Sequence, residues 1–346
     1  MEDAGVIGRL PWKKLGLPDL RDSSGERLWY AVSDNFKNSP RTTCTSPGQP
    51  GCLNSDTPGS LTVRNSNGTI VNDGAGTTGA MAVIIAPGSV LTREDGVIQV
   101  RDAANANNPV NYLDIGNGED NTTFANGSTD GFINGVVHGA DNVVLVNDRV
   151  LAISYEDLMP LLEKRVTSEV ANCLKDYAAD PLNQGRLPWA ADIVASAGGV
   201  YSDSASTRFG RLPGTFINTV ASSGISPMKN GWTALCNVNL GSWWPNWSEL
   251  VFYALADAYK PQPIPPLPTC GLCLTVNPPS SVADKRFAVI MAGRRLTGVS
   301  GGQPRSTVPN KSVIANYLED QNATPADDVF SANPSGSTFN DHLLYQ

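Results

Sequence analysis

Short apolar runs separated by Gly, Pro, Asn and Asp dominate the chain and predict β-strands. In the first half they cover residues 28–33, 60–64, 80–86 and 142–153. In the second half they cover residues 249–255, 272–277, 286–292 and 342–345. β-Branched and aromatic residues favour strands, and the intervening residue types favour turns. We therefore expect two small antiparallel sheets with long loops.

One segment between these two sets of strands has helical periodicity, with apolar residues every three or four positions. The expected apolar face consists of Leu158, Leu162, Val166, Val170, Cys173 or Leu174, and Tyr177. The residues expected to face away are Glu163, Lys164, Thr167, Ser168 and Lys175. Ser154 and Asp157 resemble a capping box, and Pro160 is tolerated in a first turn. The pattern predicts a helix over about 157–178 that packs on the second sheet.

The two halves also match in sequence. Ala-Val-Ile-Ile-Ala at 82–86 returns as Ala-Val-Ile-Met-Ala at 288–292, an offset of 206 residues. Four more matches keep the same order: 27–34 with 250–257, 61–63 with 274–276, 111–114 with 316–319, and 147–151 with 340–344. A repeat of such a long period indicates two domains and not a solenoid. We expect an α+β protein of two duplicated modules, residues 1–153 and 154–346, with the helix in the second.

The first module has strands but no helix to cover its sheet. A sheet with one apolar face needs a covering layer. Two explanations stay open. Either residues upstream of Met1 belong to a longer, anchored protein and supply the cover, or the central helix and the second module share that role.

Charge and composition exclude one class of partner. The chain has 25 Lys and Arg against 33 Asp and Glu, a net charge of −8, and its positive residues are scattered. Nucleic acid is therefore not an expected partner. With 33 Gly and 25 Pro, the composition is typical of a loop-rich secreted protein. Neither an apolar stretch of about 18 residues nor a signal peptide is present in the sequence.

The six cysteines allow many pairings, and the repeat reduces them. Cys44 and Cys52 lie between the same two predicted strands of the first module as Cys270 and Cys273 do in the second. We therefore predict local Cys44–Cys52 and Cys270–Cys273 disulfides. The two cysteines left over, Cys173 and Cys236, are expected to pair, which indicates an oxidising compartment.

Redox and zinc chemistry are the alternatives for these cysteines. Cys270 and Cys273 have CxxC spacing, but a proline-rich stretch precedes them and a strand follows, whereas a reactive thiol is favoured at a helix N-terminus. Zinc would need a second pair of ligands nearby, and His138 and His342 are isolated in the sequence. Structural disulfides are therefore favoured.

A family resemblance appears at the end of the predicted helix. Leu-Lys-Asp-Tyr-Ala-Ala at 174–179 is followed by Gly-Arg-Leu-Pro-Trp at 185–189, and the same five residues occur at 8–12. This order resembles bacterial type IV pilins and the pseudopilins of type II secretion. The resemblance implies an anchored subunit that polymerises through a hydrophobic N-terminal helix and displays a globular head. That helix and its leader are missing from this sequence, and two heads favour a minor or tip-like subunit.

Catalytic motifs are not evident. Two histidines provide few general bases, and Ser202, Ser204 and Ser206 have no Gly-x-Ser-x-Gly context. No glycine-rich phosphate loop stands between a strand and a helix. The adjacent carboxylates Asp327 and Asp328 lie in a loop-like stretch typical of solvated turns. We predict that the protein is not an enzyme, and a hydrolase is the least favoured alternative.

Calcium is the best candidate for a small ligand. The segment 114–121 alternates oxygen-bearing side chains with glycines, as a loop around a hard cation does. Its candidate ligands are Asp114, Asn117, Glu119 and Asp120. The resemblance supports this prediction, since major pseudopilins hold calcium in such a loop. The alternative is a set of Asx turns without metal, and the EF-hand spacing is not met.

Three tryptophans offer a second binding surface. Trp243, Trp244 and Trp247 cluster around Pro245. If exposed, they form a platform for a glycan or a protein. The alternative is that they cover the core of the second module.

The favoured function is therefore a non-catalytic structural or adhesive subunit of a type IV pilus-like filament or secretion pseudopilus. Its expected partners are other pilin or pseudopilin subunits, a surface glycan or a surface protein. It would contact the membrane only through the helix missing from this chain. Its expected location is the periplasmic side of the inner membrane or a surface filament. The alternative is a freestanding secreted protein that binds glycan or protein through its loops or the tryptophans.

Overall fold

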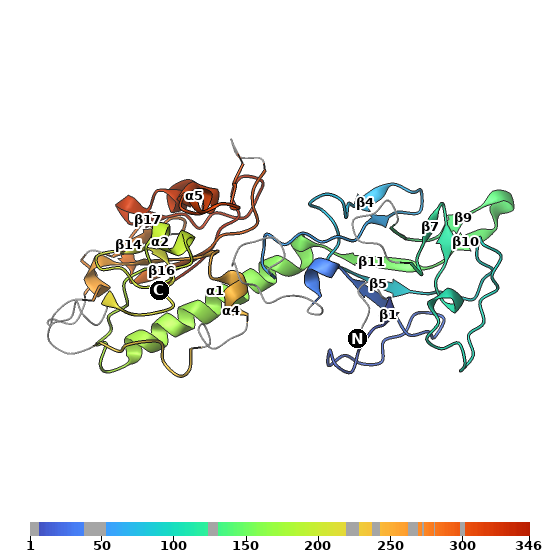
Figure 1. The fold of residues 1–346 in the computed structure, drawn as a ribbon, viewed down its shortest axis with the longest axis horizontal. Helices are drawn as coiled ribbons and strands as arrows, with labels where there is room; N and C mark the ends of the chain where they lie inside the picture. The colour runs from blue at the N-terminus through green and yellow to red at the C-terminus, as the bar shows by residue number, and fades with distance from the viewer. Residues whose placement is uncertain are drawn as a thin grey trace. The chain divides into compact units, whose positions relative to one another are not determined.

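The protein forms two compact units. The computed structural model describes residues 7–37, 53–123, 131–218, 228–236, 243–261, 269–271, 273–279, 281–297 and 302–346. The first unit consists of Met1–Thr43 and Thr57–Leu158, and the second of Cys44–Asp56 and Met159–Gln346. Each unit contains a four-stranded antiparallel sheet and a three-stranded mixed sheet (Figure 1). The fold is α+β, as the sequence predicts.

The four-stranded sheet of the first unit is antiparallel throughout. Its strand order is β1 (Gly8–Arg9), β2 (Trp29–Val32), β5 (Ala82–Ala86) and β11 (Arg149–Ile153). The three-stranded sheet has the order β4 (Ile70–Asn72), β3 (Val63–Arg64) and β8 (Phe132–Ile133), with β8 parallel to β3. Smaller elements are β6 (Ile115–Gly116), β7 (Glu119–Asp120), β9 (Val137–His138), β10 (Val144–Val146), η1 (Asp34–Phe36), η2 (Pro109–Asn111) and η3 (Ala140–Asn142).

The four-stranded sheet of the first unit buries one of its two faces. Trp29 and Ile85 are at most 1% exposed and belong to the core of this unit. Their neighbours Tyr30 and Ile84 are only half-buried, and Leu151 is 62% exposed. Alternate residues of a strand point to opposite faces. Among the described residues, the face that carries Tyr30 and Leu151 is therefore partly open.

The second unit has a sheet of the same strand number and direction. Its order is β12 (Phe209–Arg211), β13 (Val251–Leu255), β16 (Phe287–Met291) and β18 (His342–Tyr345), all antiparallel. The three-stranded sheet is β15 (Ala283–Lys285), β14 (Leu274–Val276) and β17 (Val329–Phe330), with β17 parallel to β14. Smaller elements are α2 (Ile193–Ala197), α4 (Trp244–Trp247), α5 (Val308–Lys311), η4 (Asp257–Tyr259), η5 (Ile314–Asn316), η6 (Asp320–Ala323) and η7 (Pro325–Asp327). All residues of β13 and β16 are buried, so both faces of these central strands are covered.

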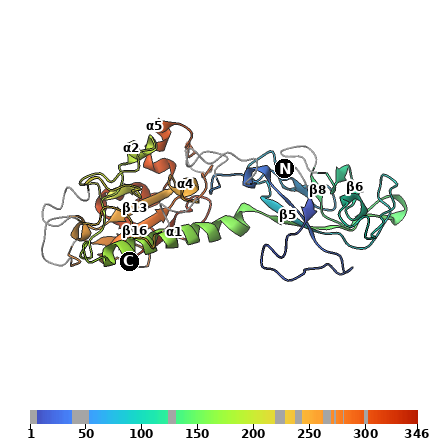
Figure 2. The same ribbon diagram turned by 60° about the horizontal axis from the view of Figure 1, so that its bottom comes forward.

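The predicted helix is α1 (Tyr155–Ala179), which begins slightly earlier than expected. The backbone N–H and the hydroxyl of Ser154 both donate to Asp157 Oδ2, at 2.8 and 2.7 Å, and fix the start of the helix. Pro160 lies within α1, near its N-terminal end. From Met159 onward, α1 lies along one face of the four-stranded sheet of the second unit (Figures 1 and 2).

The predicted apolar face of α1 is buried at Val166, Val170, Cys173, Leu174 and Tyr177, which are at most 6% exposed, but four other positions differ from the prediction. Glu163 and Thr167, expected to face solvent, are 1% and 2% exposed, whereas Leu162 is 37% exposed and Leu158 is half-buried. The carboxylate of Glu163 accepts a hydrogen bond from Ser55 Oγ at 2.5 Å and lies 2.8 Å from His342 Nε2. A charged side chain can be buried when it is paired in this way. The apolar pattern could not reveal these partners, which come from distant parts of the chain.

Two of the three predicted disulfides are present. Cys173 of α1 bonds to Cys236, with 4.8 Å between their Cα atoms, and Cys270 bonds to Cys273. The predicted Cys44–Cys52 pair lies outside the described residues. Within the second unit, the Cys173–Cys236 bond links α1 to the segment that ends at Cys236.

Candidate functional site

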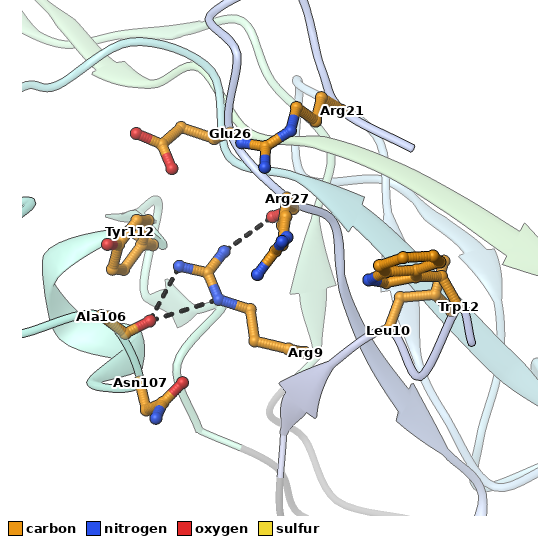
Figure 3. A pocket seen from close by; sticks show the side chains of 9 residues that line it. All are labelled: Arg9, Leu10, Trp12, Arg21, Glu26, Arg27, Ala106, Asn107 and Tyr112. Carbon is orange, nitrogen blue, oxygen red and sulfur yellow. Dashed lines mark hydrogen bonds between the residues drawn. The ribbon is translucent and has the colours of Figure 1, made fainter. Parts of the chain in front are cut away.

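A pocket of about 380 Å³ opens beside β1 in the first unit (Figure 3). Three arginines, one carboxylate and two aromatic rings dominate its lining. The lining residues are Arg9, Leu10, Trp12, Arg21, Glu26, Arg27, Ala106, Asn107 and Tyr112. The pocket contains charge and aromatic surface but no serine, cysteine, histidine or lysine. These residues can offer ionic, hydrogen-bonding and aromatic contacts to a ligand.

Arg9 lines this pocket and packs against two aromatic rings. Its guanidinium carbon lies 4.2 Å from the centroid of the Trp29 ring and 4.0 Å from that of Tyr112. Nη1 donates to the Arg27 carbonyl at 2.7 Å, and Nη2 donates to the Ala106 carbonyl at 2.9 Å. Burial lowers the pKa of Arg9, although an arginine remains charged in a protein. The backbone thus holds this cation in place, as the dashed lines of Figure 3 show.

A surface carboxylate partly neutralises the other two arginines. Asp19 lies 2.8 Å from Arg21 Nη2 and 2.9 Å from Arg27 Nε. Hydrogen bonds from Arg27 and Arg21 lower the pKa of Asp19. All three groups are solvent-exposed, so the cluster adds little to stability. It does reduce the positive charge at the rim of the pocket.

Glu26 is the only carboxylate that lines the pocket. Its side chain is 28% exposed, and it reaches the Arg101 guanidinium only at 3.9 Å, the limit of an ion pair. Among the described residues, no closer cation pairs with it. Glu26 is therefore the least engaged charged group in the lining.

The candidate calcium ligand Asp114 is fully buried and fully engaged. Its Oδ1 accepts a hydrogen bond from Gln99 Nε2 at 2.8 Å. Its Oδ2 accepts from the backbone N–H groups of Asn147 and Asp148, at 2.7 and 3.1 Å. These donors hold Asp114 within the core of the first unit.

The other three candidate calcium ligands contact protein groups. Glu119 pairs with Arg64 at 2.6 Å, and Asp120 pairs with Arg93 at 3.0 Å. Asn117 has a φ of 53°, typical of a turn. Over the described ranges, no three His, Cys, Asp or Glu side chains gather to hold a metal. Calcium binding stays a prediction, and a melting temperature unchanged by calcium or a chelator would contradict it.

Two of the three candidate tryptophans are buried. Trp244 and Trp247 of α4 are 8% and 6% exposed, and Trp243 is half-buried. The rings of Trp243 and Trp244 meet edge to face at 5.7 Å. These burial values agree with the alternative in which the cluster covers the core, and an exposed platform would need the rings turned outward.

A buried hydrogen-bond network in the first unit was not predicted. Asp148 Oδ2 accepts from the Asp114 backbone N–H and from Asn121 Nδ2, both at 2.8 Å. The amide of Asn121 also donates to and accepts from the backbone of Ile133. Burial, and then the negative charge of Asp114, raise the pKa of Asp148 well above its ordinary range. The network joins the residue after β7 to β8 and to the residue before β11.

The second unit contains the same kind of network. Asp341 Oδ2 accepts from the Glu319 backbone N–H at 3.0 Å and from Asn322 Nδ2 at 2.9 Å. Asn322 in turn exchanges two hydrogen bonds with the backbone of Ser331. Burial, and then the charge of Glu319, raise the pKa of Asp341 well above its ordinary range. The sequence signal that could have revealed both networks is the matched order of their acidic and asparagine residues.

One cluster contains a serine, a carboxylate and a histidine without the order of a catalytic triad. Glu163 lies between Ser55 and His342, so the histidine does not contact the serine hydroxyl. A serine nucleophile needs the imidazole next to it as the base. Ser55 is also only 2% exposed. The absence of catalysis stays a prediction.

Comparison with known protein families, with curated proteins and with solved structures finds no match to this chain. Within the described residues, no helix has the length and apolar character needed to span a membrane.

Proposed function

We propose that this protein is a non-catalytic structural or adhesive subunit of a type IV pilus-like filament or secretion pseudopilus. The observation that carries the proposal is the packing of α1 on the antiparallel sheet of the second unit, where the helix ends in Tyr-Ala-Ala and Gly-Arg-Leu-Pro follows at 185–188. This is the arrangement that the resemblance implies for a pilin head. The proposed partners are other pilin-like subunits, and the proposed location is the periplasmic side of the inner membrane or a surface filament.

We also propose that the two units are copies of one module, at about residues 1–153 and 154–346. Their four-stranded sheets have corresponding strand orders, β1-β2-β5-β11 and β12-β13-β16-β18. In both three-stranded sheets the central strand pairs antiparallel on one side and parallel on the other. An unrelated pair of domains would need to reach both topologies independently.

Strand register refines the proposed correspondence. Ile85 pairs with Trp29 and Val150, and Ile290 pairs with Phe252 and Leu343. These pairings support an alignment of Ile85 with Ile290, an offset of 205 residues, whereas the matched letters have an offset of 206. A one-residue slip moves every side chain to the opposite face of the sheet. Under the proposed correspondence, the match of 82–86 with 288–292 is one residue out of register.

Side-chain contacts support the same correspondence. Gln99 Nε2 donates to Asp114 in the first unit, as Gln303 Nε2 donates to Glu319 in the second. Arg101 Nη1 donates to the carbonyl of Gly88, as Arg305 Nη1 donates to that of Gly293. The Asn121 and Asn322 networks add to this set. Shared ancestry explains why so many specific contacts occur twice.

Immunogold electron microscopy of the source cells tests the filament role. Antibodies raised against the whole chain are expected to label surface filaments and the sheared filament fraction, and to lose that label in a strain lacking the gene. Label found only as free protein in the culture medium would contradict the proposal. It would favour the freestanding secreted binding protein instead.

A further inference from the structure

The second unit contains a counterpart of the Arg9 pocket. Arg211 pairs with Phe252 in the sheet, as Arg9 pairs with Trp29. Its guanidinium lies 5.1 Å from the Phe252 ring and 4.8 Å from the Tyr317 ring. Gly-Arg-Leu-Pro occurs a third time at 210–213, and this copy, rather than 185–188, occupies the position of 8–11 in the sheet.

A lysine of the same chain occupies this counterpart. Arg211 Nη2 donates to the carbonyl of Lys311 at 2.9 Å, just as Arg9 Nη2 donates to the carbonyl of Ala106. Lys311 and Ala106 therefore hold equivalent backbone positions. The Lys311 ammonium lies 2.7 Å from Glu249 Oε2, and their side chains are only 10% and 3% exposed. The hydroxyl of Tyr317 also donates to Glu249.

The first unit has a glutamate at the position of Glu249 but no lysine at the position of Lys311. Arg9 Nη1 donates to the Arg27 carbonyl before β2, and Arg211 Nε donates to the Glu249 carbonyl before β13, at positions one residue apart in the proposed correspondence. Glu26 and Glu249 are equivalent by the offset of the paired strands. Alanine at position 106 provides no ammonium. The pocket of Figure 3 therefore lies where the second unit carries a lysine side chain.

We propose that the pocket of the first unit binds a primary alkylammonium group, the side chain of a lysine from another protein chain, through an ion pair with Glu26 beside Tyr112. The arginines around the pocket already have partners: the donors of Arg9 point at backbone carbonyls, Asp19 pairs with Arg21 and Arg27, and Arg101 reaches Glu26 only at 3.9 Å. In the second unit an arginine, an ammonium and a glutamate already coexist in this geometry. The inference uses the contacts of the two units and does not depend on the filament role.

Titration of the full chain with small amines tests the site. The probes are n-butylammonium and Nα-acetyl-lysine N-methylamide, with Nε-acetylated lysine as the uncharged control and acetate as the anionic one. Chemical shift changes are expected at Tyr112 and at the Trp12 indole with both amines, and not with the acetylated probe. A response to the lysine derivative alone would identify a peptide-bound lysine, and an equal response to both amines would show that the ammonium suffices. Shifts caused by acetate and not by the amines would overturn the proposal.

Two variants in the first unit make the test decisive. Glu26→Gln keeps the shape of the side chain and is expected to weaken amine binding at least tenfold. Ala106→Lys restores the residue of the second unit, so it is expected to abolish amine binding and raise the melting temperature. If Ala106→Lys binds amines as the parent chain does, the equivalence with Lys311 is wrong.

Lys311→Ala provides the matched reverse change. It leaves Glu249 buried without its cation and is expected to lower the melting temperature. Added n-butylammonium is expected to recover part of that loss, with no such effect on the parent chain. Failure of the amine to rescue this variant, together with unchanged binding by Glu26→Gln, would overturn the proposal even if the filament role holds.

Discussion

The side-chain amide of Asn322 links its own segment to Ser331 and to Asp341 in the second unit. It exchanges hydrogen bonds with the backbone of Ser331 and donates to Asp341, and it is fully buried. Asn121 does the same in the first unit. At the sequence level these asparagines look like ordinary loop residues. Their role depends on partners from other strands, which no local pattern can reveal.

Asn322→Ala is expected to destabilise the second unit by about 3 kcal/mol, because each buried group left without its partner costs about 1–3 kcal/mol. Asn121→Ala should have a similar effect on the first unit. Urea unfolding followed by far-UV circular dichroism measures both. Asn172→Ala on the exposed face of α1 is the control and should change stability by less than about 0.5 kcal/mol. An equally small effect of Asn322→Ala would show that the network is not structural.

Asp341 predicts a pH dependence of stability. Its folded-state pKa lies above the unfolded value of about 3.9, so the folded protein binds this proton more tightly. The stabilisation is complete below the unfolded pKa and is lost as pH rises through the folded one. Asp341→Asn imitates the protonated acid. When the pH rises from about 5 to about 8, its free energy of unfolding should therefore fall less than that of the parent chain. Parallel urea unfolding curves at both pH values, with exposed Asp284→Asn as the control, check this.

At the scale of elements, regular periodicity made α1 and the central strands predictable. Period-two and period-3.6 patterns directly reflect which side of an element is buried. The same rule failed at Glu163, since it assigns charged residues to solvent and cannot see the hydroxyl and imidazole that meet this carboxylate. The pocket was not predicted either, because its lining comes from segments that are distant in the sequence. Its lining joins β1 to a loop near residue 106 that only the fold brings close.

The Cys173–Cys236 disulfide is expected to contribute more to the free energy of unfolding than the Cys270–Cys273 disulfide. It closes a span of 63 residues, and the chain-entropy relation gives about 4 kcal/mol for a loop of this size. The Cys270–Cys273 bond spans 3 residues and should contribute about 2 kcal/mol. Double Cys→Ala variants at each pair, compared by urea unfolding, measure the difference. An equal loss from the two pairs would contradict the loop-size explanation.

The whole molecule consists of two units, each with its own sheets and its own buried network. Calorimetry of the full chain is therefore expected to resolve two unfolding transitions. Asn121→Ala should lower the temperature of one transition and Asn322→Ala that of the other. A single transition shifted by both variants would mean that the units unfold together. The sequence predicted two parts from matched letters, and the proposed register between them comes from the strand pairing.

The matched asparagine networks have a consequence for building hybrid chains. In the first unit the network spans residues 99–121 and also includes the Asn-Asp pair just before β11. In the second unit it spans residues 303–322 and includes the Asn-Asp pair just before β18. A graft that carries the whole run from one unit into the other brings its donors and acceptors together as a set. A graft whose border falls near Asp114 or Glu319 joins part of one network to part of the other. The segments on either side of these residues differ in length between the two units. Hybrids of the two units are therefore expected to fold when they are joined at the borders of the network and not when they are joined within it.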